Sequence, residues 1–285
     1  MDEVFRADRV LSQRTQKPRS ECFDLLKQRR VWLKPGDTGN DEEDWESIPG
    51  PSSKLTMDTP LWIDRTHAVP MPPPLIMAYH KPKWVLSVTS DVQLQRPYLD
   101  ETIVPTSMHP VGRLDYDSSG LLLFSSSGPL TQRLLHPKHA IPKVYQTIVT
   151  DRVDAEKLGE QLSSGVTTGE GVHTADLLSV EHFPPEDVAP YLQSVQSNLP
   201  THYNQTDLKQ RGYLDIFEAT ALSTVTLRVR EGKHRMVRRM LANCGHPVVT
   251  LTRLQLGEIN LDDLPEGSQR RLTDTEEAWI RAVMP

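Results

Sequence analysis

The spacing of apolar residues divides this chain into a short N-terminal part and a longer, strand-rich part. After residue 75, apolar residues alternate with polar ones or form short continuous runs, a pattern typical of strands. Helical spacing appears in the stretches between these runs. The expected strands cover residues 75–79, 84–88, 120–124, 143–149, 172–183, 213–218 and 224–229, and the expected helices cover 130–135, 154–162, 231–241 and a final stretch after Thr273.

The first 70 residues are interpreted as a small separate module of helices and strands. Val10 and Leu11, followed by apolar positions in 22–26, have helical spacing, and Ser20 is the expected N-cap of the second helix. Short strands are expected at 29–33, 54–57 and 61–63. Prolines 70 and 72–74 form a stiff linker, so we place the domain boundary there, with domains 1–70 and 71–285.

Two local signals refine the second domain. Thr273 is an expected N-cap, and Glu276 occupies the position that completes a capping box. Residues 184–211 are polar, and we interpret them as an insertion of one helix and a loop. Gly245 lies where a glycine ends the helix of residues 231–241.

Composition narrows the class of protein. The chain has 285 residues, of which 37% are hydrophobic and 25% charged, as in globular proteins. No apolar run approaches the roughly 20 residues that span a bilayer, and the N-terminus lacks a signal-peptide pattern. Two cysteines provide neither a disulfide framework nor a zinc cluster, and His136 and His139 are too few for a metal site. We expect an intracellular protein without a membrane or metal, with its compartment left open.

Charge is unevenly distributed along the chain. The net charge of −6 argues against indiscriminate binding to nucleic acid. Acidic residues gather in 37–46, which we interpret as an exposed loop, whereas 228–239 holds six cationic side chains against the single acid Glu231. A polyanion such as RNA is therefore expected to contact this local basic segment.

The most informative segment is 109–124, in which Gly112-Arg113-Leu114-Asp115 precedes an almost purely apolar strand. A carboxylate in a tight turn before a buried strand is held in a fixed position and direction, as an aspartate nucleophile must be. The alternative is an ordinary polar turn, in which Asp115 caps a neighbouring backbone N–H.

This segment resembles the catalytic motif of the RsuA-type pseudouridine synthases, which isomerise uridine within RNA. Three further matches follow in the order of that family. Lys143-Val144-Tyr145 is similar to its lysine-x-tyrosine strand, 231–248 to its basic helix and next strand, and 251–273 to its closing strand and turn. The turn after residue 79 resembles the opening hairpin, although His80 and Met236 depart from the usual asparagine and glutamine.

The resemblance implies a role for each matched residue. Asp115 would be the nucleophile, Tyr145 would stack on the target base, and Arg238 would pair with Asp115. The alternative for Tyr145 is a structural role, as a core tyrosine whose hydroxyl is hydrogen-bonded locally. Arg253 would reach RNA or form a structural salt bridge. The remaining cationic residues expected to contact RNA are Arg113, Lys143, Lys233, Arg235 and Arg239.

We therefore expect an α+β protein of the pseudouridine synthase fold, with a mixed, mainly antiparallel central sheet flanked by helices. The N-terminal module weakly resembles the alpha-L RNA-binding motif, and a simple helical extension is an equal alternative. The expected activity is isomerisation of a specific uridine, most often in ribosomal RNA, by a monomer that needs no cofactor. The alternatives are a non-catalytic RNA-binding or ribosome-assembly factor and, less favoured, a hydrolase that uses Asp115.

Overall fold

The computed structural model describes residues 4–15, 17–33, 45–57, 59–69, 75–89, 96–100, 102–105, 108–203, 206 and 213–284. The chain divides into two compact units, Met1–Pro73 and Pro74–Pro285. In the described part of the chain, no helix is both long and apolar enough to cross a membrane. Most of the expected acidic loop at 37–46 and the proline linker lie outside the described residues.

The N-terminal unit combines two helices with two small sheets. Its elements are β1 (Val4–Arg6), α1 (Ala7–Thr15), α2 (Arg19–Lys27), β2 (Val31–Leu33), β3 (Glu46–Ser47), β4 (Lys54–Thr56), β5 (Trp62–Ile63) and β6 (His67–Ala68). Val10 and Leu11 of α1 pack against Leu25 and Leu26 of α2, which confirms both helices. The expected cap at Ser20 is wrong, because α2 begins at Arg19 directly after a proline and no side chain caps it.

The second unit is built on a nine-stranded sheet in the order β13-β14-β10-β15-β9-β7-β17, with β8 paired to β9 and β16 to β15. Among the described strands of this sheet, only β9 and β15 pair in parallel, so the sheet is mixed and mainly antiparallel, as predicted. The elements in the first half are β7 (Ile76–Lys81), β8 (His109–Val111), β9 (Ser119–Ser125), α3 (Gly128–Leu135), β10 (Lys143–Thr150), α4 (Ala155–Ser164), β11 (Val166–Thr168), β12 (Gly171–His173) and β13 (Asp176–His182). Those in the second half are α5 (Pro185–Ser197), α7 (Tyr213–Phe217), β14 (Leu222–Val229), α8 (Met236–Asn243), β15 (Val248–Leu256), β16 (Ile259–Asn260), β17 (Gln269–Arg271) and α9 (Asp274–Val283).

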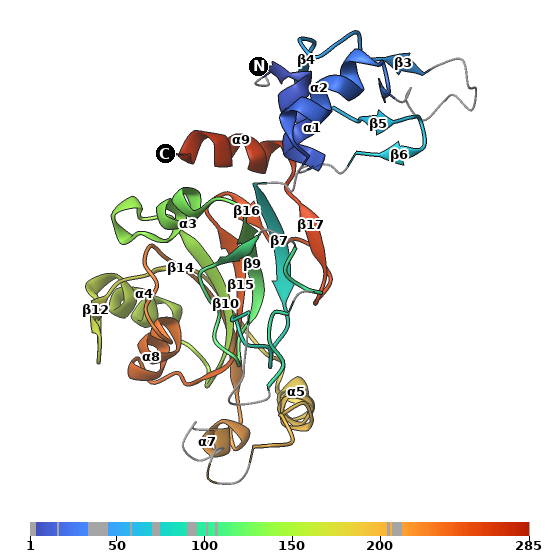
Figure 1. The fold of residues 1–285 in the computed structure, drawn as a ribbon. Helices are drawn as coiled ribbons and strands as arrows, with labels where there is room; N and C mark the ends of the chain where they lie inside the picture. The colour runs from blue at the N-terminus through green and yellow to red at the C-terminus, as the bar shows by residue number, and fades with distance from the viewer. Residues whose placement is uncertain are drawn as a thin grey trace. The chain divides into compact units, whose positions relative to one another are not determined.

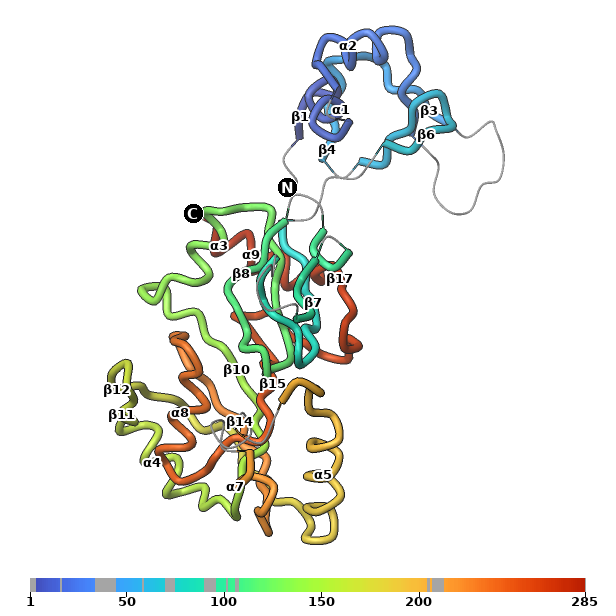
Figure 2. Tube along the Cα trace, turned by 60° about the horizontal axis from the view of Figure 1, so that its bottom comes forward, coloured from blue at the N-terminus to red at the C-terminus, as the bar shows by residue number. Residues whose placement is uncertain are grey.

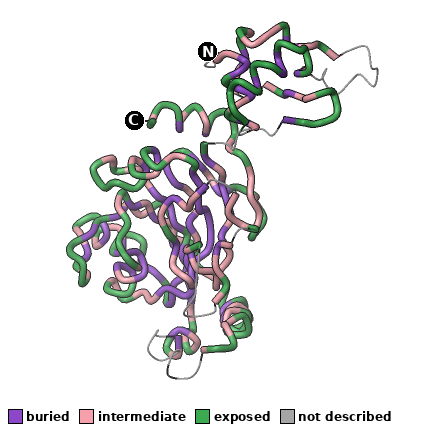
Figure 3. Tube along the Cα trace, viewed as in Figure 1, coloured by how far each residue is buried: buried purple, intermediate pink, exposed green. Residues whose placement is uncertain are grey.

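Helices cover the central sheet from both faces. Helices α4 and α8 lie on one side and α5 on the other, as Figures 1 and 2 show from two directions. Leu158 of α4 and Leu241 of α8 share a core with Phe124 of β9. On the other side, Leu192 of α5 packs in a separate core with Val249 of β15. Buried residues consequently follow the strands and the inward helix faces (Figure 3).

Two expected strands are wrong. Residues 84–88 form a loop, in which only Leu86 makes an isolated bridge, to Tyr98; the left-handed backbone of Trp84, at φ 64°, departs from an extended chain. Residues 213–217 form helix α7, which packs with Leu192 of α5 and Val249 of β15. Tyr213 and Phe217 stack with ring centroids 5.7 Å apart, as residues four apart do on one helical face.

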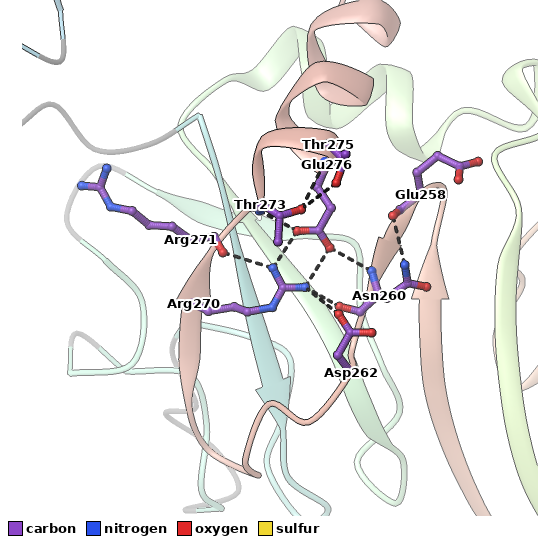
Figure 4. Close-up of polar contacts among 8 residues, drawn as sticks. All are labelled: Glu258, Asn260, Asp262, Arg270, Arg271, Thr273, Thr275 and Glu276. Atoms are coloured by element: carbon purple, nitrogen blue, oxygen red, sulfur yellow. Dashed lines mark hydrogen bonds and ion pairs between the residues drawn. The ribbon is translucent and has the colours of Figure 1, made fainter.

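The C-terminal helix is fastened by a polar network around Glu276 (Figure 4). Thr273 caps α9 and Glu276 binds the Thr273 N–H in return, which confirms the predicted capping box. Arg270 donates to both Glu276 oxygens, at 2.6 and 2.7 Å, and the Asn260 N–H donates to one of them at 3.1 Å. Burial alone would raise the pKa of Glu276, but these hydrogen bonds and the charge of Arg270 lower it to about 2.

Candidate active site

A cavity of about 310 Å³ is bordered by the turn before β9, strands β10 and β15, and the segment that leads into α8. These elements come from distant parts of the sequence and meet only in the folded sheet. The lining residues are Gly112, Arg113, Leu114, Asp115, Ser118, Leu135, Lys143, Tyr145, Val229, Glu231, Gly232, Lys233, His234, Arg235, Met236, Val237, Leu251 and Arg253.

The turn that carries Asp115 is held from both sides. The Ser87 hydroxyl donates to the Leu114 carbonyl at 2.8 Å and accepts from the Leu114 N–H at 3.0 Å. The Ser118 N–H donates to the Asp115 carbonyl at 3.0 Å, and the Trp84 N–H donates to the Tyr116 carbonyl at 2.7 Å. The backbone on either side of Asp115 is thus fixed by direct hydrogen bonds.

Asp117 anchors the same turn to the segment before α8. Its carboxylate, 4% exposed, accepts hydrogen bonds from both terminal nitrogens of Arg235, at 2.8 and 2.9 Å. Arg238 adds an ion pair at 3.6 Å and donates to the Asp117 carbonyl at 2.8 Å. Burial would raise the pKa of Asp117, but the charges of Arg238 and Arg235 outweigh it and lower the pKa to about 2.

The floor of the cavity is formed by two neighbouring strands. Tyr145 of β10 lies opposite Arg253 of β15 in the ladder, and both side chains line the cavity. Arg253 is 3% exposed and donates from Nε to the Leu121 carbonyl at 2.7 Å. Its Nη2 is buried and, among the described residues, has no hydrogen-bond partner. Lys143 lies on the same face as Tyr145, and burial lowers its pKa to about 8.

The predicted site residues are brought together in part. Asp115 and Tyr145 line one cavity, as do the predicted RNA contacts Arg113, Lys143, Lys233 and Arg235. Arg238 and Arg239 do not line it. Arg239 instead forms an exposed ion pair with Glu170, at 2.8 Å.

The predicted pairing of Arg238 with Asp115 is wrong in this structure. The carboxylate partner of Arg238 is Asp117, whereas Asp115 makes no ion pair among the described residues. The physical reason is burial. A carboxylate as deeply desolvated as Asp117 requires a cation beside it, and Asp115 is half-buried at the edge of the cavity.

Several residues that shape the site were not predicted from the sequence. Asp117 was overlooked although it stands two positions after Asp115, and Arg253 was left undecided although it follows Leu251 at the spacing of one strand face. Glu231 lines the cavity, and its carboxylate lies 2.9 Å from Nδ1 of the buried His173. In the described ranges, no group of three His, Cys, Asp or Glu side chains is placed to hold a metal ion.

Comparison with known proteins agrees with this architecture. The family model of RNA pseudouridylate synthase matches residues 76–243. Ribosomal large subunit pseudouridine synthase E of Xanthomonas campestris is 32% identical over 216 residues, which cover 74% of this chain and 99% of that protein. Ribosomal large subunit pseudouridine synthase B of Bacillus subtilis is 28% identical over 211 residues, covering 74% and 72%. Ribosomal small subunit pseudouridine synthase A of Yersinia pestis is 27% identical over 282 residues, covering 98% and 99%.

A solved structure shares the fold. A crystal structure of a pseudouridylate synthase, 21% identical, superposes with a TM-score of 0.52 and covers 98% of this chain and 99% of its own. The mixed sheet and its helices therefore have the pseudouridine synthase fold. The chain belongs to the RNA pseudouridylate synthase family, and it is accordingly an isomerase.

Proposed function

We propose that this protein converts a specific uridine of ribosomal RNA to pseudouridine, with Asp115 as the nucleophile. One observation carries the proposal: Asp115 and Tyr145, 30 positions apart in the sequence, line a single cavity together with five arginine and lysine side chains. The relatives named above are synthases of the large or small ribosomal subunit, which supports ribosomal RNA as the substrate class.

The proposed reaction rearranges bonds without gain or loss of atoms. Asp115 acts either at C1′ of the ribose or on a sugar proton, and the N1–C1′ bond breaks with its electron pair leaving on uracil. The freed uracil rotates and C5 bonds to C1′, while Asp115 leaves C1′ or, on the second route, returns the sugar proton. The C5 proton then departs and N1 takes up a proton. Tyr145 offers an aromatic plane for the unstacked base, and its hydroxyl lies available for the C5 proton. Substrate and product are isomers, so no redox partner is consumed.

The cations divide into three groups by their surroundings. Arg253 lines the cavity and has a buried nitrogen with no hydrogen-bond partner among the described residues, so we assign to it, in place of Arg238, the guanidinium that balances Asp115 or the reacting nucleotide. Arg238 acts through Asp117 and is a positioning residue. Arg113 and Lys233 lie at the cavity wall, where they are suited to RNA phosphates.

The decisive experiment is Asp115→Asn, assayed by tritium release from RNA labelled at uridine C5. We expect the variant to release no tritium while it keeps the wild-type unfolding midpoint and RNA affinity. Asp263→Asn, an exposed aspartate on the loop before β17, is the matched control and should behave as the wild type. An Asp115→Asn variant that retains the wild-type rate contradicts the nucleophile assignment.

The same assay tests the alternative of a non-catalytic RNA-binding protein. A wild-type protein that binds ribosomal RNA but releases no tritium from it, or from transcripts of either subunit, would favour that alternative. A map of pseudouridines in cells that lack the protein identifies the target uridine as the position that is no longer modified.

We also propose that the N-terminal unit contacts RNA outside the cavity. Exposed guanidinium groups lie over aromatic rings there, Arg9 over Phe5 at 4.6 Å and Arg65 over Trp32 at 3.9 Å. Such pairs present both a cation and a flat surface to a nucleic acid. Replacing both arginines by glutamine should weaken RNA binding and leave the rate at saturating RNA unchanged. An unchanged RNA affinity would favour the alternative, in which the N-terminal unit is a structural extension.

A further inference from the structure

A second cavity, of about 620 Å³, lies on the opposite face of the sheet from the candidate active site. The alternation of β10 shows this directly, because Tyr145 lines the first cavity and its neighbour Gln146 lines the second. The volume falls in the range of about 300–1,000 Å³ that small-molecule sites have. Its far wall is formed by Tyr191 and Asn198, which come from the insertion that this chain carries.

The floor of this second cavity is unexpectedly polar. Gln146 of β10 pairs with Thr252 of β15, which in turn pairs with Ser119 of β9, so three adjacent central strands present one row of polar side chains. Central strands covered by helices are normally apolar on both faces. The Ser119 and Thr252 hydroxyls satisfy each other at 3.0 Å, whereas the Gln146 side chain is exposed. A polar row at the centre of a sheet favours a ligand that carries hydrogen-bonding groups.

The near wall of the second cavity presents an indole. Trp84 holds a left-handed backbone, at φ 64°, which is strained for a bulky residue. The buried Lys81 ammonium maintains that conformation by donating to the carbonyls of Pro82, at 2.6 Å, and Val85, at 2.8 Å. The ring lies 5.6 Å from that of Tyr116, which belongs to the turn of Asp115. Trp84 thus lines the second cavity while its ring contacts the turn of Asp115.

The two cavities are adjacent along the chain. Ser118 lines the first and Ser119 the second, so the turn of Asp115 and the start of β9 separate them. The second cavity also holds one cation, Lys83, and one carboxylate, Glu266. These groups together match a nucleotide. The aromatic plane can stack on the base, the amide and hydroxyl groups can bind the base edge, the cation can bind the phosphate, and the carboxylate can bind the ribose hydroxyls.

We propose that the second cavity binds a nucleotide of the RNA strand outside the target uridine, with its base against Trp84 and its polar edge on Gln146. The proposal rests on the proposed function for its RNA ligand, and it assigns the insertion a role in choosing the substrate. Because the site does not touch the reacting uridine, it contributes to RNA affinity and sequence preference rather than to the rate of the chemical step.

The test is Gln146→Glu in the full chain, which sets a negative charge on the polar row without changing side-chain length. Gln193→Glu, on an exposed position of α5 outside the cavity, is the matched control with the same charge change. We expect Gln146→Glu to weaken binding of single-stranded ribosomal RNA fragments about tenfold, the effect of losing a base contact and repelling a phosphate. The control should match the wild type, and tritium release at saturating RNA should be equal in all three proteins.

Two measurements separate the possible outcomes. Binding is measured directly, so an inactive wild-type protein would overturn the proposed function and still leave the affinity of the second cavity measurable. Equal RNA affinity in Gln146→Glu and the wild type would overturn the present proposal. Adenosine monophosphate, titrated alone against tryptophan fluorescence, tests a free nucleotide: loss of its binding in Gln146→Glu with unchanged RNA affinity would assign the cavity to a small nucleotide and overturn the RNA strand. If the control Gln193→Glu also binds RNA more weakly, the loss of affinity is a general effect of added negative charge, and the present proposal is overturned.

Discussion

Asp117→Asn is the substitution that best tests how the turn of Asp115 is held. In the wild type, the buried Asp117 carboxylate accepts two hydrogen bonds from Arg235 and an ion pair from Arg238. Asparagine has nearly the same shape and keeps one acceptor oxygen, but it removes the negative charge. The buried Arg238 guanidinium and the partly exposed Arg235 guanidinium then both lie beside a neutral, buried amide.

The magnitude follows from the pKa of Asp117. Lowering it from 3.8 to about 2 corresponds to about 2 kcal/mol of folding free energy supplied by the ionised form. Breaking a buried pair by removing one partner typically costs about 3–5 kcal/mol. Since asparagine retains one hydrogen bond, we expect a loss of about 2–4 kcal/mol at pH 7, together with at least a tenfold drop in tritium release because Asp115 is less firmly positioned.

The assay is urea unfolding of wild type and variant between pH 2 and pH 7. A carboxylate with a lowered pKa contributes stability that is present above its unfolded value and disappears as the pH falls through its folded value. The wild type should therefore lose its advantage over Asp117→Asn between about pH 4 and pH 2. The Glu276 network titrates in the same window, but it is present in both proteins and cancels in the difference.

Two results would refute this reasoning. The first is a variant within about 0.5 kcal/mol of the wild type at pH 7, the range of ordinary surface substitutions. The second is a stability difference that stays constant down to pH 2, which would assign the loss to packing rather than to charge.

Three further substitutions have defined outcomes. Tyr145→Leu should raise KM in tritium release about tenfold by removing base stacking, and Tyr145→Phe should retain KM. Gly120→Ala should destabilise the fold by more than about 3 kcal/mol in urea unfolding, because its Cβ would lie 2.3 Å from a backbone oxygen of β15; Gly128→Ala, with open space, should be neutral. Glu276→Gln should lower the free energy of unfolding by about 3 kcal/mol at pH 7. This difference should vanish toward pH 2, because protonation of Glu276 then removes the charged partner of Arg270 in the wild type as well.

Periodicity predicted the elements whose pattern is long or sharply bounded. The strands around Phe124 and Val149 and the helix of Leu158 are present, as is the capping box of Thr273. Short apolar runs were less reliable, since 213–217 has the composition of a strand and folds as a helix through its contacts with α5 and β15. The loop at Trp84 is set by hydrogen bonds that the Lys81 side chain donates to the loop and that the Trp84 N–H donates to the Tyr116 carbonyl, and the pattern of apolar residues does not indicate these bonds.

The amino-acid sequence alone determined the family, the mixed sheet, and the identity of Asp115 and Tyr145 as candidates, because these depend on ordered motifs and on alternation within single elements. The tertiary structure decided which charges meet. Arg238 pairs with Asp117 rather than Asp115, and Arg253 enters the cavity, because burial selects the partner of each charge and burial arises only when distant strands and helices pack together.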